Sequence, residues 1–242
     1  MRIRKKIERK VLNTYKLDRH GLLRPAMLMN ELQAIADTHA ENLGAGRSFC
    51  VAENIAWVVT HYLIEIIEMP TDKEEIEIST WPSLHDALRA ARDFRICGAD
   101  GREMVRATSQ WVMIDMETRK PLRLSDKLPA NWKVMPERAL DSAFDKFPEF
   151  APDTRVDVHP RFDDFDVNQH INNAVYAAWA TEALGFDFRD AHKLRALNIN
   201  FKKEIPAGAA GVMVESKLEG LTSRHMIKSG DIEHANVICE WE

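Results

Sequence analysis

Apolar residues recur every three or four positions between Pro25 and Leu43, which is the spacing of one face of an α-helix. Proline suits the first position of a helix, and Gly44 stands just after the last apolar residue, where glycine commonly ends a helix. The segment therefore predicts an amphipathic helix with one buried face. That face contains Leu28, Leu32, Ile35, Ala36, Ala40 and Leu43.

After this helix the pattern changes to that of β-strands. Apolar and polar residues alternate strictly in Glu75–Trp81, as expected for a strand with one buried face. The first part of the chain is thus predicted to run as one helix followed by several strands. The predicted strands are 55–67, 75–81, 88–97 and 104–114.

The same order of elements then starts again. A short strand at 156–160 and a helix at 172–184, ended by Gly185, precede strands at 196–201, 211–218, 222–228 and 234–240. Glu68-Met69-Pro70 in the first part matches Glu204-Ile205-Pro206 in the second. A helix packed on an antiparallel sheet, present twice, predicts an α+β pseudo-dimer.

The prolines mark the boundary between the two copies. Residues 121–153 hold five of the ten prolines and show little periodicity, which is typical of a connector that runs over a surface. We therefore expect an N-terminal domain at 1–120, a proline-rich connector at 121–153 and a C-terminal domain at 154–242.

Composition and charge exclude several classes of protein. The chain has 242 residues, of which 45% are hydrophobic and 29% charged, and no apolar run approaches the ~20 residues that a membrane span needs. The basic N-terminus leads into no apolar signal segment. The formal charge of −5 argues against nucleic acid as the main ligand. Three cysteines without C-x-x-C spacing favour reduced thiols in a cytoplasm.

A dense polar cluster stands immediately before the second predicted helix, in Phe162–Asn173. Its Asp164, Asp166 and Asn168 match the first ligand positions of a calcium-binding EF-hand loop, but the required glycine and the final glutamate of that pattern are absent. A plain helix cap would need only one asparagine. The first half has Met29-Asn30-Glu31 near the corresponding place, so only the second half is predicted to be catalytic.

These motifs resemble those of a known family, the acyl-(acyl carrier protein) thioesterases of the plant and bacterial type, which are built from two tandem hot dog folds. The resemblance covers nearly the whole chain. It rests on Asp-Val-Asn-Gln-His-Ile-Asn-Asn at 166–173 with Tyr176 and Trp179, on Ile55–Thr60 and on Ser109–Met113. It implies a double hot dog fold in which each sheet wraps around a long helix.

The resemblance also implies an activity: hydrolysis of the thioester between a fatty acyl chain and the phosphopantetheine arm of acyl carrier protein. From the polar cluster at 166–173 and the incomplete calcium pattern, we expect this reaction to need no cofactor or metal. The catalytic positions carried over by motif are Asp166, Asn168, His170 and Glu204. Plant members carry a cysteine directly after that glutamate, whereas this chain has Ile205. A water activated by a carboxylate is therefore expected in place of a cysteine nucleophile. The plant transit peptide is absent, which is consistent with a bacterial cytoplasmic protein.

The residues suggest how this chemistry would proceed. Either Glu204 or Asp166 would take a proton from water, while Asn168 and His170 orient the water and the base. Backbone N–H groups at the start of the 172–184 helix would receive the oxyanion. Direct attack by a carboxylate through an anhydride is an alternative.

Other residues are predicted to bind the acyl chain or the acyl carrier protein. We expect Leu32, Ile35 and Trp57 in the first half to line an acyl pocket, and we interpret His39 as a hydrogen-bonded helix residue. Acyl carrier proteins are acidic, so a basic docking surface is expected. One candidate is the N-terminal segment Arg2–Lys10. The favoured candidate is the set Lys193, Arg195, Lys202 and Lys203.

Three other functions fit parts of the pattern. A hot dog hydrolase acting on acyl-coenzyme A would share the aspartate before the helix. A non-enzymatic acyl-thioester-binding module would need no base, so the combination of Asp166, His170 and Glu204 weighs against it. A hot dog dehydratase would use a different His/Asp or His/Glu arrangement. The protein is expected to act without nucleic acid or membrane, and a homodimer stays open.

Overall fold

The computed structural model describes residues 5–129, 132–141, 144, 146–209 and 211–242. The chain forms two compact units, one made of Met1–Arg24 with Asn30–Ala143 and the other of Pro25–Met29 with Phe144–Glu242. Arg2 and Arg4 of the basic N-terminal segment lie outside the described residues. Each unit is described below by itself.

The first unit contains an antiparallel sheet in the order β1-β3-β4-β5-β2. Buried residues alternate with more exposed ones at the start of β3, over residues 75–80, as predicted from the sequence, whereas residues 80–83 are all buried. Ile76 and Ile78 are fully buried. The strands are β1 (Lys6–Val11), β2 (Ile55–Ile66), β3 (Glu75–His85), β4 (Arg89–Gly98) and β5 (Glu103–Asp115).

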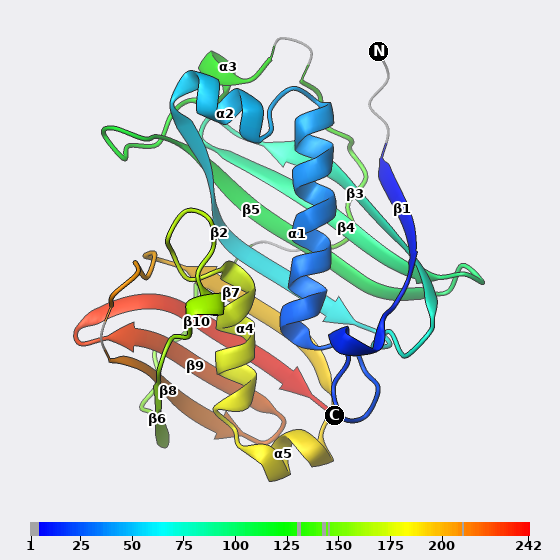
Figure 1. The fold of residues 1–242 in the computed structure, drawn as a ribbon, viewed down its shortest axis with the longest axis vertical. Coiled ribbons are helices and arrows are strands. Elements are labelled where there is room, and N and C mark those ends of the chain that lie inside the picture. Colours follow the sequence, from blue (N-terminus) through cyan, green and yellow to red (C-terminus); the bar gives the residue numbers. More distant parts are fainter. Residues whose placement is uncertain (1–4, 130–131, 142–143, 145, 210) are drawn as a thin grey trace. The chain divides into compact units, whose positions relative to one another are not determined.

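The long helix α1 (Pro25–Asn42) crosses one face of this sheet, as Figure 1 shows. Leu32 and Ile35 on its buried face have no exposed surface. Pro25 begins the helix and Gly44 follows its end at φ +74°, a left-handed conformation that favours glycine. The short helix α2 (Arg47–Glu53) follows and leads directly into β2.

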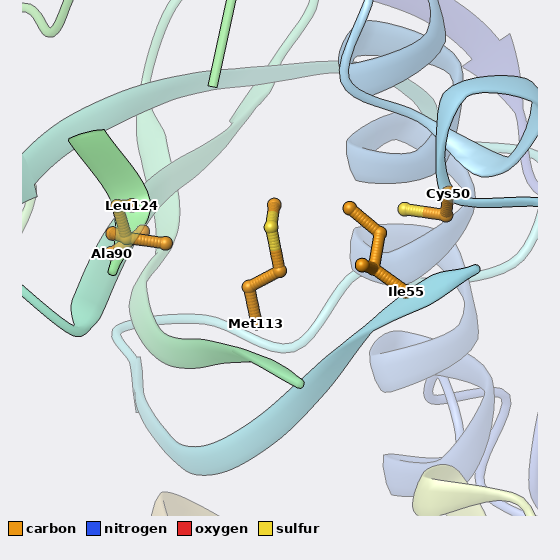
Figure 2. Packing of buried hydrophobic residues seen from close by; sticks show 5 residues of the cluster. All are labelled: Cys50, Ile55, Ala90, Met113 and Leu124. Atoms are coloured by element: carbon orange, nitrogen blue, oxygen red, sulfur yellow. The ribbon is translucent and has the colours of Figure 1, made fainter. Parts of the chain in front are cut away.

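A small apolar cluster closes the end of the sheet near α2. Figure 2 shows how its members come from α2, from three strands and from the short helix α3 (Leu124–Lys127). Because α3 belongs to the proline-rich segment, that segment is anchored to the first sheet at this point. The cluster consists of Cys50, Ile55, Ala90, Met113 and Leu124.

The proline-rich segment is also held on the sheet by a buried carboxylate. Asp93 in β4 is fully buried and accepts hydrogen bonds from the hydroxyls of Ser83 (2.9 Å) and Thr108 (2.7 Å). The Arg138 side chain (2.9 Å) and the Ala139 backbone N–H (2.7 Å) also donate to it. A buried charge needs such partners, so these bonds fix the position of the segment.

The second unit repeats the design with a sheet in the order β7-β10-β9-β8-β6. Helix α4 (Asn173–Glu182) contacts β8, β9 and β10, and α5 (Phe186–Ala191) follows it (Figure 1). Gly185, between the two helices, has φ +82°. The strands are β6 (Thr154–Val158), β7 (Leu194–Phe201), β8 (Val212–Glu219), β9 (Thr222–Ser229) and β10 (Ile232–Trp241).

A long helix on an antiparallel sheet in each unit is the double hot dog architecture that the sequence predicts. The structure adds elements that the pattern did not reveal. β1 has charged residues at most positions, which is common for an edge strand, and α2, α3 and α5 are too short for a clear period. No helix among the described residues is long and apolar enough to span a membrane.

Candidate active site

The polar cluster before α4 folds into a tight turn organised by Asp166. One oxygen of its carboxylate accepts the backbone N–H groups of Asn168 (2.8 Å) and His170 (3.3 Å). Its own N–H donates to the His170 carbonyl at 2.8 Å. Gln169 completes the turn at φ +64°. The turn therefore places Asp166, Asn168 and His170 together.

A short bridge brings Glu204 to this turn. The N–H of Ile171 donates to the Ile205 carbonyl at 3.0 Å, and His170 pairs with Pro206 in an antiparallel bridge. As a result, Nε2 of His170 lies 3.6 Å from Oε2 of Glu204. The four residues predicted to be catalytic thus lie in two neighbouring segments.

The His170–Glu204 pair is accessible to water. The exposed fractions of the two side chains are 29% and 36%. A separation of 3.6 Å is slightly long for a direct hydrogen bond, and such pairs in unliganded sites often tighten or bridge through water when substrate binds. The arrangement can hold a water beside a carboxylate and an imidazole.

Tyr176, in the first turn of α4, is buried next to the segment that carries Glu204. Its ring packs edge-on against Phe201, with 5.4 Å between centroids. Burial raises the pKa of the phenol, the negative charges of Glu204 and Asp166 raise it further, and a hydrogen bond with the Ile205 backbone works in the opposite direction. Tyr176 is therefore a neutral phenol that contacts the segment carrying Glu204.

Three backbone N–H groups around the start of α4, where the oxyanion is expected, have acceptors within the protein. The Asn172 side chain accepts the N–H of Ala174 at 2.9 Å, and its carbonyl accepts the N–H of Val175 at 2.9 Å. The N–H of Asn172 itself donates to the Asp164 carbonyl at 2.9 Å. These three amide groups already have protein acceptors, because the helix cap uses them.

Asp164, the first position of the calcium-like pattern, has a structural partner. Its carboxylate is buried and lies 2.8 Å from the guanidinium of Arg161, and it also accepts the Arg161 N–H at 2.8 Å. Among the described residues, no group of three or more His, Cys, Asp or Glu side chains is placed to hold a metal ion.

None of the cysteines has the surroundings of a nucleophile. Cys239 is fully buried, and burial raises the pKa of its thiol to about 12, although Ser223 and Arg189 act to lower it. Burial also raises the pKa values of Cys50 and Cys97. A raised pKa disfavours the reactive thiolate at neutral pH.

The first half contains a copy of the Asp166 turn, at Asp18–Leu23. The Asp18 carboxylate accepts the N–H groups of His20 (2.8 Å) and Leu22 (3.0 Å), and the Asp18 N–H donates to the Leu22 carbonyl at 2.8 Å. Gly21 has φ +73°. Asp18, His20, Gly21 and Leu22 thus correspond to Asp166, Asn168, Gln169 and His170.

The sequence prediction placed this counterpart at Met29-Asn30-Glu31, and that prediction is wrong. Glu31 lies inside α1, where its carboxylate pairs with Lys10 at 2.8 Å and with Lys16. A search for polar residues does not locate this turn, because its backbone conformation needs only an aspartate and a residue that tolerates positive φ.

The counterpart of Glu204 is also shifted by one residue from the sequence match. The Leu23 N–H donates to the Pro70 carbonyl at 2.8 Å, just as the Ile171 N–H donates to Ile205. Pro70 therefore corresponds to Ile205, and Met69 corresponds to Glu204. The first half lacks both the imidazole and the carboxylate of the second.

The residues assigned to the acyl chain lie in the first unit. Leu32 and Ile35 are fully buried in α1, facing the sheet. Trp57 in β2 is half-buried, and its ring N–H donates to the Ala45 carbonyl at 3.0 Å. His39 is buried, and its Nδ1 lies 3.1 Å from Nη1 of Arg92.

The four basic residues assigned to docking do not form one group. Lys193 and Arg195 stand at the start of β7, whereas Lys202 and Lys203 follow its end. The seven residue steps from Arg195 to Lys202 along an extended strand span about 23 Å. Arg195 pairs with Glu242 at 3.3 Å and Lys202 pairs with Glu233. Only Lys202 and Lys203 adjoin the catalytic segment.

The chain is similar to known proteins over most of its length. The chain is 27% identical over 216 residues to oleoyl-acyl carrier protein thioesterase 2 of Arabidopsis thaliana, covering 81% of this chain and 59% of the relative. It is 30% identical over 218 residues to an acyl-(acyl-carrier-protein) hydrolase of Cuphea viscosissima, covering 84% and 51%. The chain thus spans little more than half the length of these chloroplastic relatives.

Solved structures share the fold over the whole chain. A Lactobacillus plantarum protein, described as a candidate oleoyl thioesterase, superposes with a TM-score of 0.89 at 26% identity, covering 99% of this chain and 96% of its own. The 12:0-acyl carrier protein thioesterase of Umbellularia californica superposes with a TM-score of 0.83 at 19% identity, covering 100% and 99%, which shows the shared fold.

Family models match both halves. The acyl-(acyl carrier protein) thioesterase N-terminal domain matches residues 5–132, and the C-terminal domain of the same family matches residues 149–242. These ranges contain the two turns and the His170–Glu204 pair. The chain therefore belongs to the acyl-(acyl carrier protein) thioesterase family.

Proposed function

We propose that the protein hydrolyses fatty acyl thioesters of acyl carrier protein, releasing a free fatty acid and the carrier protein thiol and so ending chain elongation. Family membership supports this reaction, and the observation that carries it is the His170–Glu204 pair, 3.6 Å apart and open to water beside the Asp166 turn. We place the reaction in the bacterial cytoplasm, with no metal or cofactor required.

Glu204 is the base in this proposal. Its carboxylate removes a proton from a water molecule, and the resulting hydroxide attacks the thioester carbonyl carbon. General-base assistance of this kind contributes roughly 10²–10⁴-fold to a rate. His170 orients the water and the carboxylate. Collapse of the tetrahedral intermediate expels the thiolate, which leaves readily because a thiol has a pKa near ~8.5, and the proton held by Glu204 neutralises it.

Asp166 is less suited to act as the base. Its carboxylate accepts the backbone N–H groups of Asn168 and His170, and the Asn168 side-chain amide donates to it at 3.3 Å. Asp18 makes the same two backbone contacts in a half that lacks the other catalytic groups. Asp166 therefore serves to build the turn that presents Asn168 and His170.

The oxyanion requires donors other than the capped amides of α4. The side-chain amide of Asn168 is exposed and carries a second N–H besides the one directed at Asp166. We assign the oxyanion to this amide. Losing one such donor typically costs about 10²–10³-fold in rate.

The first half would hold the acyl chain. Its α1 face is apolar and fully buried at Leu32 and Ile35. Trp57 in β2 adds a half-buried aromatic side chain, which packs against the apolar cluster near α2. Enclosing a fatty chain between a helix and a sheet removes its methylenes from water, at ~0.8 kcal/mol each. We therefore propose that this half selects chain length while the second half supplies the chemistry.

Carrier protein docking is proposed near the end of β7. Lys202 and Lys203 directly precede Glu204, so an acidic carrier bound there would deliver its phosphopantetheine arm to the base. Lys193 and Arg195, at the other end of the strand, would contribute only to long-range attraction.

The deciding experiment measures thiol release from a panel of acyl carrier protein esters of different chain lengths, with the matching coenzyme A esters alongside. We expect preferential hydrolysis of the carrier protein esters, an unchanged rate in chelator, and retained activity after all three cysteines are replaced by serine. Faster turnover of the coenzyme A esters would support the acyl-coenzyme A hydrolase instead. Binding without turnover would support a thioester-binding module.

Isotope labelling distinguishes attack by water from attack by the Glu204 carboxylate through an anhydride. After turnover in ¹⁸O-labelled water, attack by water on the acyl carbon puts the label only in the fatty acid. Label in a peptide that contains Glu204 would indicate covalent participation of the carboxylate.

A further inference from the structure

Glu204 lies beyond the end of β7, so no strand ladder holds it in place. β7 ends at Phe201, and the next two residues are bound by His234 in β10. The His234 carbonyl accepts the backbone N–H groups of both Lys202 (2.8 Å) and Lys203 (3.2 Å). Contacts made by these two neighbours therefore contribute to the position of Glu204.

The His234 side chain adds a second contact to the same segment. Its Nδ1 lies 2.9 Å from the Lys203 carbonyl, and its Nε2 lies 2.6 Å from the Ser229 hydroxyl. A carbonyl can only accept, so Nδ1 carries the proton. His234 is 3% exposed, and burial lowers its pKa, so the ring is neutral and Nε2 accepts from Ser229. The serine thus fixes the ring in the tautomer that holds Lys203.

A β-bulge directs His234 towards this segment. In the pairing of β10 with β9, Glu233 pairs with Lys228 and Ala235 with Ile227, which leaves His234 unpaired. Bulges re-aim side chains and are frequent beside active sites. Here the bulge directs a buried imidazole at the residue before Glu204.

The first half has the same backbone arrangement without these side chains. The Met104 carbonyl accepts the N–H groups of Ile67 (2.9 Å) and Glu68 (3.1 Å), and Met104 is skipped by the same kind of bulge in β5. Gly98 occupies the position of Ser229. The fold therefore requires neither the imidazole nor the hydroxyl. Both are present only in the half that contains Glu204.

We propose that His234 and Ser229 are positioning residues that hold the Lys203 carbonyl and thereby orient Glu204 towards His170. This inference rests on the proposed function. The imidazole fixes the peptide plane immediately before Glu204, and the serine fixes the imidazole. Misplacement of a catalytic group by about 1 Å can cost up to ~10²-fold in rate, so the contact affects turnover more than substrate binding.

The test compares variants that replace one contact at a time. His234→Met introduces the residue found at the equivalent bulge of the first half. His234→Asn places an amide N–H near the position of Nδ1, whereas His234→Gln places one near Nε2. Ser229→Gly copies Gly98. Met104→Leu, at the first bulge, is the matched control. For each variant kcat and KM are measured with an acyl carrier protein ester, together with the thermal midpoint.

We expect kcat to fall about ten- to a hundredfold in His234→Met and His234→Gln, with KM nearly unchanged, and to fall less in Ser229→Gly. His234→Asn should recover most of the rate. In a Glu204→Ala background, His234→Met should cause no further loss, because the group it positions is gone.

Three results would overturn the inference. The first is an equal loss of kcat in His234→Asn and His234→Gln that parallels their loss of thermal stability. The second is a full additional loss of kcat when His234→Met is added to Glu204→Ala. The third is a change in KM with kcat unaltered. Should His234→Met fail to fold, the Asn and Gln pair decides, and Ser229→Gly tests the hydroxyl independently. Absence of hydrolysis by the unmodified protein would instead refute the proposed function.

Discussion

The two turns that precede α1 and α4 have the same backbone but different side chains. In both, an aspartate carboxylate accepts two backbone N–H groups and a residue at positive φ closes the turn. His170 in the second turn is replaced by Leu22 in the first. The shared aspartate is therefore explained by architecture, and the residues that differ include those to which we assign the chemistry.

The same contrast extends to the segment after the following strand. Met69 occupies the position of Glu204, and Met104 occupies that of His234. Three polar groups of the second half thus have apolar counterparts in the first. Since the backbone hydrogen bonds are retained without them, the fold alone does not explain their presence, and they mark the half that we propose to be catalytic.

Replacing Glu204 with its counterpart residue should have the largest effect. Glu204→Met removes the base while supplying a side chain that the same backbone already accommodates at Met69, so kcat should fall roughly 10²–10⁴-fold with little change in the thermal midpoint. The matched change Met69→Glu should leave kcat unaltered. Rates of thiol release measure both. A Glu204→Met variant that keeps full turnover would end the proposed division between the halves.

A buried histidine in the second half should make the protein sensitive to acid. His225 in β9 is fully buried between the hydroxyls of Ser216 and Ser223, where the first half has Phe94. Burial lowers the pKa of His225 to about 4, from an ordinary value near 6.5. Between pH ~6.5 and ~4, His225 therefore binds a proton in the unfolded chain but not in the folded chain.

Stability should consequently fall as the pH is lowered from ~6.5 to ~4, by about 3 kcal/mol from this residue. Unfolding in urea across this pH range measures the effect. In His225→Phe the pH dependence of the unfolding free energy should decrease by this amount, whatever the stability of the variant at neutral pH. An identical pH dependence in the variant would show that His225 does not cause the acid sensitivity.

The two aspartates test which part of the turn is architectural. Asp18→Ala and Asp166→Ala each remove an acceptor for two backbone N–H groups, so each should lower the free energy of unfolding by about 1 kcal/mol. Only Asp166→Ala should also reduce kcat, because only that turn presents Asn168 and His170. Chemical unfolding and thiol release are measured on the same samples. A loss of activity in Asp18→Ala would contradict the comparison.

Substitutions inside the first half should change selectivity. Ile35→Phe fills space on the buried face of α1, so the preferred acyl chain should become shorter, with each excluded methylene worth ~0.8 kcal/mol. Chain-length profiles on carrier protein esters measure this. Phe188→Leu, in α5 of the second half, serves as the control. Unchanged profiles across a set of such variants would place the acyl pocket outside the α1 face.

Charge reversal at the two ends of β7 should give the smallest effect. Lys202→Glu with Lys203→Glu should raise KM for carrier protein esters about two- to fivefold, because exposed charges contribute up to ~1 kcal/mol each. The matched pair Lys193→Glu with Arg195→Glu should change KM less. High salt should mimic the first pair, and a short acyl-pantetheine ester should be hydrolysed at the same rate. Equal losses on both esters would indicate damage to the site.

The local patterns of the chain were sufficient to predict much of this protein. Hydrophobic periodicity located both long helices and the strands after them, because a residue's exposure in a helix or strand follows its position in the repeat. Pro25, Gly44 and Gly185 marked helix ends for steric reasons that are local. The motif around Asp166 likewise identified the turn, since its hydrogen bonds join residues within a few positions of each other.

Only the tertiary structure determined which segments distant in the sequence contact each other. The approach of Glu204 to His170 depends on a bridge between two segments, and the bulge at His234 depends on strand register, neither of which any local period encodes. Register also showed that Met69, not Glu68, matches Glu204, and strand length separated Lys193 from Lys203. Side-chain identity sets the local conformation, but pairing between strands determines which side chains meet.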